Sequence, residues 1–160
     1  MSFSDAQWAS LCGALRLRRE SERDLARCLP ARELLDEATC TALLDKLGPV
    51  ILSPSRRITA SLLGKRLSFL LTGACLYAMS ACDKGLQLSL ANTLVEYGHD
   101  DGVWTSSLPL HSLAVSRPEP GARDDWRKAV ATQLFAGLLQ PLWDTFYGVT
   151  GVSRRILWEN

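Results

Sequence analysis

A long apolar segment without a proline constrains the fold of this chain more than any other feature. It follows Pro54 and runs from Ser55 to Cys82. Ser55 is a favourable helix N-cap, and the polar run Asp83-Lys84-Gly85 suits a helix end. The segment therefore predicts one long helix around which the rest of the chain is organised.

The residues after this helix have the features of antiparallel strands. Leucines alternate with polar residues over 86–90, so one face of that strand would be apolar. Residues 93–97 predict the next strand, and the glycine-flanked turn 98–102 predicts a hairpin. A further strand is expected within 108–115, where Pro109 restricts it to a sheet edge. The predicted fold class is α+β, mostly helical with a central antiparallel strand meander.

Helical spacing of apolar residues predicts more helices on both sides of this unit. The expected helices are 5–17, 16–27, 32–46, 123–147 and 153–160. The second of these is dense in charges of both signs, which favours a solvated helix face with salt bridges over a basic binding patch. Pro141 is expected to kink or split the helix that contains it.

Size and charge predict one domain, residues 1–160, without affinity for nucleic acid. The chain has 18 Lys and Arg against 17 Asp and Glu, a net charge of +1. A nearly neutral chain gives no electrostatic reason to bind nucleic acid, so any charge argument has to be local.

The sequence predicts a cytoplasmic protein. The first residues lack the basic and apolar regions of a signal peptide. The most apolar run, Leu67–Cys82, is shorter than the roughly 20 residues of a membrane span, which favours a buried core helix. Peripheral contact with a membrane stays open but has no support in the sequence. An odd number of cysteines without a secretory signal indicates reduced thiols.

The cysteines predict no metal site. The five of them, Cys12, Cys28, Cys40, Cys75 and Cys82, include no CxxC pair and no adjacent pair. Buried thiols that act as small apolar side chains are the simpler interpretation.

Two histidines leave an acid–base site open as a weaker alternative. His99 lies beside Asp100 and Asp101 and close to Glu96, and His111 follows soon after. No nucleophile motif such as GxSxG accompanies them, which disfavours a hydrolase or transferase.

Three stretches carry short motifs in a fixed order. They are Gly85-Leu86 with Ser89-Leu90-Ala91-Asn92, then DGVWTSSLPL at 101–110, then Gly151-Val152-Ser153 with Leu157-Trp158-Glu159-Asn160. Together they resemble the N-terminal part of the FhuF-like ferric siderophore reductase family. A more distant resemblance is to the C-terminal region of IucA/IucC-type siderophore synthetases. Their ATP chemistry has no support here, because no glycine-rich phosphate loop with a lysine is present.

The resemblance implies a cytoplasmic protein that binds a ferric siderophore and reduces Fe(III) to Fe(II). In the family a [2Fe–2S] cluster carries the electron, on adjacent cysteines followed by a CxxC motif. This sequence has neither, so no cysteine is assigned to the cluster, which is expected only if a C-terminal cysteine segment exists. The apolar run Ile156–Trp158 stops without a helix end signal, and we expect that such a segment has been lost.

The expected role is therefore the siderophore-binding scaffold of a reductase, truncated or degenerate, with an electron donor protein as a possible partner. A non-enzymatic interaction module, or an accessory protein of siderophore biosynthesis, is the alternative. Ferric siderophores are often anionic, and cations beside aromatic rings suit them. The candidate ligand-binding residues are Arg56, Arg57, Lys65, Arg66, Trp104, Arg154 and Arg155. The competing interpretation is a set of solvated cations with a core tryptophan.

Overall fold

The fold is mixed α+β and mostly helical, as the sequence predicts. The computed structural model describes residues 3–160. Its α-helices are α1 (Asp5–Gly13), α2 (Glu37–Val50), α3 (Arg56–Cys82), α4 (Arg123–Leu134), α5 (Gln140–Thr150) and α6 (Arg154–Glu159). Two 3₁₀ turns are Glu20–Glu22 and Ala31–Leu35, and a π-helical turn is Phe135–Leu139. The strands are β1 (Leu17–Arg19), β2 (Cys28–Pro30), β3 (Gly85–Leu86), β4 (Leu94–Glu96), β5 (His99–Asp100), β6 (Val103–Trp104), β7 (Leu108–Leu110) and β8 (Val115–Ser116).

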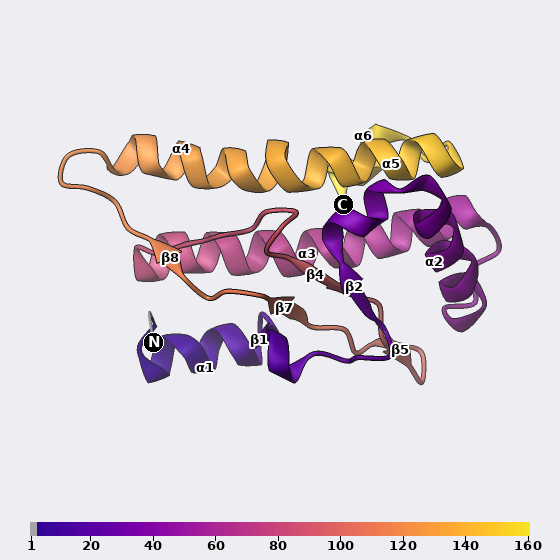
Figure 1. Cartoon of the computed structure of the whole chain (residues 1–160), viewed down its shortest axis with the longest axis horizontal. Coiled ribbons are helices and arrows are strands. Elements are labelled where there is room, and N and C mark those ends of the chain that lie inside the picture. The colour runs from indigo at the N-terminus through magenta and orange to yellow at the C-terminus, as the bar shows by residue number, and fades with distance from the viewer. Residues whose placement is uncertain (1–2) are drawn as a thin grey trace.

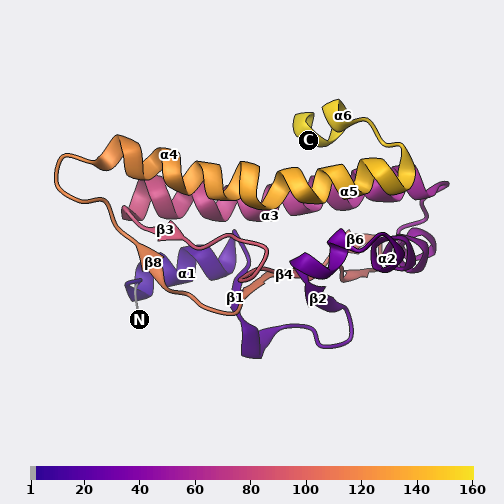
Figure 2. The ribbon, with the colours of Figure 1, turned by 45° about the horizontal axis from the view of Figure 1, so that its top comes forward.

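The predicted long helix forms as α3 and lies at the centre of the fold. Ser55 Oγ accepts a hydrogen bond from the backbone N–H of Ile58 at 3.3 Å, which caps its first turn. The helix ends at Asp83, whose φ of 49° is left-handed. In Figures 1 and 2, α3 lies between the α4–α5 helices and a layer of α1 and the strands. Both neighbouring layers cover apolar side chains of α3, so this helix supplies the middle of the core.

Of the described residues, α3 alone is long and apolar enough to cross a membrane by length and composition. Half of its most apolar 18-residue window is buried inside the protein. A buried core helix passes the same test, so the finding is weak evidence for a span.

The helix predicted around Pro141 is split, and the split takes the form of a π-helical turn. The prediction placed one helix over 123–147. The structure has α4, then the turn Phe135–Leu139, then α5 with Pro141 in its first turn. Proline has no N–H to donate to the carbonyl four residues earlier, so the bonding pattern widens just before it. Figure 1 shows α4 and α5 as one nearly continuous rod across the molecule. The final helix, α6, is confirmed as well.

The strands form four pairs, and most of them join distant parts of the chain. β1 pairs with β7 in parallel, β2 pairs with β4, and β3 pairs with β8. The hairpin predicted at 98–102 is confirmed by the pairing of β5 with β6. The strands of the predicted meander are thus divided among several pairs. An alternating pattern fixes which face of a strand is apolar, but it does not determine which other strand pairs with it.

The strand predicted over 86–90 is shorter than expected. Only β3, Gly85–Leu86, is extended within a pair. The side chain of Asn92 replaces further strand pairing, since its Nδ2 donates to Gln87 O at 2.8 Å and to Ser112 O at 2.9 Å. The amide of Asn92 therefore satisfies the local backbone in place of a neighbouring strand.

The helix predicted over 16–27 is wrong. That segment forms β1 and a 3₁₀ turn, then continues to β2. Its charges do pair at the predicted short range, as in Arg23–Glu20 at 3.6 Å. Such i,i+3 pairs suit a turn as well as a helix, and the burial of Leu17 against β7 decides for the strand. The helix predicted at 32–46 begins later, at Glu37, because Asp36 caps it through the N–H of Thr39 at 2.9 Å.

Candidate functional site

One face of α3 is left uncovered by the two layers. Its exposed large apolar side chains recur at helical spacing: Ile58, Leu62, Phe69 and Leu76. Helix α6 packs on α3 beside this face and also contacts α5. Gly64 permits that close approach, because a Cβ there would lie 2.9 Å from Leu157 Cδ2. The crossing of α6 leaves a hollow on each side of it.

The first hollow, called here the Lys65 pocket, has a volume of about 390 Å³. Its lining is Lys65, Ser68, Phe69, Thr72, Gly73, Leu76 and Asn160. Lys65 is exposed and has no ion-pair partner among residues 3–160. The Phe69 ring is 52% exposed, so the pocket offers a cation, an accessible aromatic face and hydroxyl groups together. This combination suits a large anionic ligand with apolar parts.

Arg66 borders the Lys65 pocket through Phe69. Its guanidinium carbon lies 5.8 Å from the centre of the Phe69 ring. Arg66 Nε donates to Ser106 Oγ at 3.0 Å, and its Nη2 donates to Ser106 O at 2.6 Å. Ser106 is buried, so these bonds fix the partly buried guanidinium against a rigid support.

A second arginine, Arg16, reaches the same support from the chain that follows α1. Its Nε donates to Ser106 O at 2.9 Å and its Nη2 donates to Thr105 O at 2.7 Å. Burial, together with the positive charge of Arg16, holds the pKa of Arg66 below its ordinary value. Neither arginine forms an ion pair with any carboxylate in the part of the chain that the structure describes.

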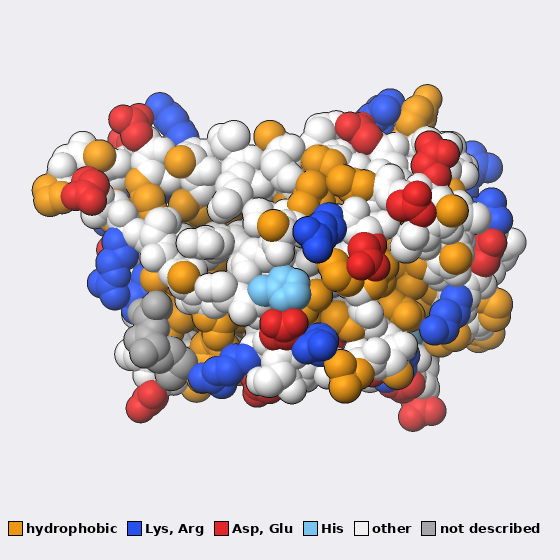
Figure 3. Space-filling view, in the orientation of Figure 1, with side chains coloured by type: hydrophobic (Ala, Val, Ile, Leu, Met, Phe, Trp, Pro, Cys, Tyr) orange, Lys and Arg blue, Asp and Glu red, His pale blue; other side chains and the backbone are white. Residues whose placement is uncertain are grey.

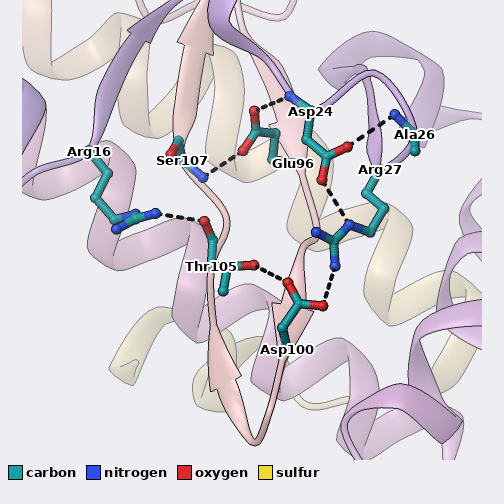
Figure 4. A network of polar contacts seen from close by, with 8 residues as sticks. All are labelled: Arg16, Asp24, Ala26, Arg27, Glu96, Asp100, Thr105 and Ser107. Carbon is teal, nitrogen blue, oxygen red and sulfur yellow. Dashed lines mark hydrogen bonds and ion pairs between the residues drawn. The ribbon is translucent and has the colours of Figure 1, made fainter.

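A network of polar contacts holds the backbone that anchors Arg16 (Figure 4). The hydroxyl of Thr105 donates to Asp100 at 3.0 Å, and Asp100 pairs with Arg27 at 2.9 Å. This pairing lowers the pKa of Asp100. The buried carboxylate of Glu96 accepts from Ser107 N at 2.7 Å and also from a backbone N–H of the preceding β1–β2 connection. Hydrogen bonds therefore hold the segment 105–107 from both sides, and this ordered segment accepts the hydrogen bonds of the two arginines.

The predicted ligand-binding residues do not gather in one place. Lys65 and Arg66 lie together at Phe69. Arg57 lines the second hollow, of about 450 Å³, on the other side of α6. Trp104 lies on β6, packed edge-on against His99 with ring centres 5.0 Å apart.

The remaining three arginines of the prediction are engaged with carboxylates on the surface. Arg56 pairs with Asp45 at 2.8 Å, Arg154 with Asp144 at 2.9 Å, and Arg155 with Glu159 at 2.7 Å. Sequence reasoning missed Arg16 and Phe69 as partners of Lys65 and Arg66. Phe69 could have been found from its helical spacing to Lys65 and Arg66, whereas nothing local to Arg16 signals its position.

The histidines do not form an acid–base site with the neighbouring carboxylates. His111 Nδ1 lies 3.0 Å from Glu20 Oε1, and hydrogen bonding to His111 lowers the pKa of Glu20. His99 contacts Trp104, while both carboxylate oxygens of Glu96 accept backbone N–H groups. Among residues 3–160 none of the three carboxylates named in that alternative, Glu96, Asp100 and Asp101, is paired with a histidine, and the histidine–carboxylate pair that does form is His111 with Glu20.

The cysteines are dispersed and do not fit a [2Fe–2S] cluster. Burial raises the pKa of Cys28, Cys40 and Cys75 to about 11, and it also raises the pKa of Cys12 and Cys82. Within residues 3–160 no three His, Cys, Asp or Glu side chains are grouped so that they could hold a metal ion. No chemical step is therefore assigned to such a cluster.

Other parts of the surface suit an anionic ligand less well. A hollow of about 610 Å³ between α2 and α5 has Glu37 and Asp45 in its lining and no lysine or arginine. Figure 3 shows acidic and basic side chains interspersed over the front face, without a broad patch of one sign. The fold and the uncovered face of α3 thus define an α+β domain with a local cationic and aromatic binding face.

The comparison with known families agrees with the sequence motifs. Residues 61–160 match the family described as ferric iron reductase FhuF-like transporter. The match covers more than half of the chain, so the chain belongs to the FhuF-like ferric iron reductase family. No curated protein and no solved structure shows a significant match to it. The matched region contains the entire Lys65 pocket but not Arg16.

Proposed function

We propose that this protein handles siderophore iron by binding a ferric siderophore in the Lys65 pocket. The observation that carries the proposal is the grouping of Lys65, Arg66 and the exposed ring of Phe69 at one hollow inside the family match. An iron-loaded siderophore is large and often anionic, and its organic backbone can pack on an aromatic ring.

The proposed role in reduction is to hold the complex while one electron converts Fe(III) to Fe(II). The iron is the substrate, and the electron comes from a reduced donor protein that approaches the bound complex. Fe(II) is a weaker Lewis acid than Fe(III), so the oxygen ligands of the siderophore release it. We place this activity in the cytoplasm, where the five unpaired cysteines would stay reduced.

The test is a binding titration that follows quenching of tryptophan fluorescence by a ferric trihydroxamate siderophore. Replacing Lys65 or Phe69 by alanine should weaken binding by about tenfold each, since each change removes one contact that stabilises the bound anion. Lys128→Ala is the matched control, because Lys128 is 79% exposed on α4, away from the pocket. Equal affinity in all three variants would show that the ligand does not use this pocket.

A second function rests on a different observation. The exposed apolar side chains of α3 continue onto α6 with Ile156 and Trp158, which are 47% and 40% exposed. Such a strip suits an interaction module that binds another protein. Concentration-dependent sedimentation of the purified chain would favour this role, and a monomer at all concentrations would count against self-association.

A further inference from the structure

The two arginines on Ser106 form an electrostatic arrangement that the fold itself does not balance. Arg16 Nε and Arg66 Nη2 contact the same carbonyl oxygen at 2.9 Å and 2.6 Å. Their nitrogen atoms are thus no more than about 5.5 Å apart, a separation at which like charges repel. The pKa of Arg66 is lowered by its burial and by Arg16, which shows that the charged form is disfavoured there. A bound anion would relieve both costs.

Each guanidinium keeps hydrogen-bond donors for such an anion. Arg16 and Arg66 both use Nε and Nη2 to bind Thr105 or Ser106. In both side chains the Nη1 group has no hydrogen-bond partner among residues 3–160. A guanidinium presents these remaining donors as a planar fork, which matches the two oxygens of a carboxylate.

The arrangement is fixed before any ligand arrives. Arg16 has a left-handed φ of 56°, an unfavourable conformation for a residue with a side chain. Its carbonyl accepts the N–H of Leu108 at 2.9 Å, and the β1–β7 pairing follows directly. The position of Arg16 is therefore set by backbone bonds and by the network of Figure 4, so little side-chain freedom remains to be lost on binding.

The arginine pair lies at the edge of the Lys65 pocket. Arg66 contacts the ring of Phe69, which lines that pocket. On the same side, Leu15 Cδ2 would lie 3.0 Å from a Cβ at Gly73, another lining residue. The segment that carries Arg16 thus borders the pocket, although neither arginine is part of the pocket lining, and a ligand that extends from the pocket past Phe69 would meet the two guanidinium groups.

We propose that Arg16 and Arg66 bind a free carboxylate of the siderophore, so that this protein selects ferric siderophores that carry one. The inference rests on the proposed function, because it assigns a substrate class to the same pocket. Phe69 and Lys65 hold the body of the ferric complex, while the arginine pair reads a group that is not bound to iron.

The experiment compares two probes that bind iron through identical groups. One is a ferric trihydroxamate with a free carboxylate, and the other is its methyl ester. The wild-type protein should bind the acid at least about tenfold more tightly than the ester, as charge-assisted bidentate hydrogen bonds require. Arg16→Gln and Arg66→Gln should each reduce this preference to about twofold or less. Arg16→Gln should leave the affinity for the ester unchanged, whereas Arg66→Gln should also weaken ester binding, because Arg66 supports Phe69 at the pocket that holds the body of the complex. Lys128→Gln, with the same change of charge on α4, should keep the preference.

The outcomes separate the two proposals. If wild-type protein binds the acid and the ester equally, siderophore binding stands and the carboxylate site is overturned. The same holds if both arginine variants fold and keep the preference. If neither probe binds, the proposed function fails together with this inference. Circular dichroism checks folding, and if Arg66→Gln does not fold, Arg16→Gln decides the question because Arg16 lies outside the helices.

Discussion

Two arginines on the same helix have opposite electrostatic surroundings. Arg56, in the first turn of α3, forms two hydrogen bonds of 2.8 Å with the carboxylate of Asp45, and these raise its pKa. Arg66, in the middle of α3, meets backbone, a hydroxyl group and another arginine, and its pKa is lowered. The comparison teaches that an anionic ligand gains most binding free energy at cations without a carboxylate partner, and not simply where the sequence has many cations.

Helix α6 lies between the Lys65 pocket and the hollow lined by Arg57, and Gly64 makes its packing on α3 possible. Gly64→Val would place a Cβ 2.9 Å from the buried Leu157 side chain and 3.6 Å from the Trp143 ring. We expect a loss of about 1–3 kcal/mol in the free energy of unfolding, measured by urea denaturation. Gly13→Ala is the control, because nothing lies within 4 Å of a Cβ there, and it should not destabilise. Equal stability of the Gly64 variant and the wild type would mean that α6 is not seated as described.

Ligand affinity tests the comparison directly. Arg66→Ala should weaken binding of a carboxylate-bearing ferric trihydroxamate by at least about tenfold, because it removes one of the two guanidinium groups proposed to bind the carboxylate. Arg56→Ala and Arg154→Ala should change affinity by less than about twofold, since both side chains already bind carboxylates. Fluorescence titration measures all three. Comparable losses at Arg154 would break the comparison and favour the site that the sequence predicts on α6.

The smallest expected effect is on the pH dependence of stability. Arg56 lowers the pKa of Asp45, so this carboxylate stabilises the fold above the ordinary aspartate pKa of about 4 and loses that contribution as pH falls through its lower folded value. Asp45→Asn should therefore lose slightly less stability than wild type between about pH 5 and about pH 2.5. Arg66→Ala should keep the full wild-type acid dependence, as no carboxylate pairs with it. Urea midpoints at low salt are the measurement, and an altered acid slope in Arg66→Ala would reveal a carboxylate partner.

Much of the helical architecture could be predicted, since its signals are local. Ser55 and Asp83 bound α3, and Pro141 splits the helix that contains it. The hairpin at 98–102 follows from its glycine-flanked turn, and the motif order indicates the family. Lys65 and Arg66 were among the candidate residues for the same kind of reason, because cations on a long apolar helix are visible in the sequence.

The parts that could not be predicted depend on partners far away in the chain. The segment 16–27 has charge spacing that fits a helix, yet its pairing with β7 makes it a strand and a turn. Asn92 ends the strand predicted at 86–90 through bonds to Gln87 and Ser112. The local charge spacing is compatible with a helix and also with a strand and turn, so the two conformations have similar local free energies. Long-range burial therefore decides between them.

By itself the sequence determined the α+β class, the central helix, the family and two of the cations at the pocket. Only the tertiary structure decided which cations are neutralised by carboxylates and which are left for a ligand. Arg16 and Arg66 are fifty residues apart and meet because β1 pairs with β7 and the buried backbone of Ser106 lies between them. Caps and periodicity act over a few residues, whereas the meeting of two like charges follows from the packing of the whole fold.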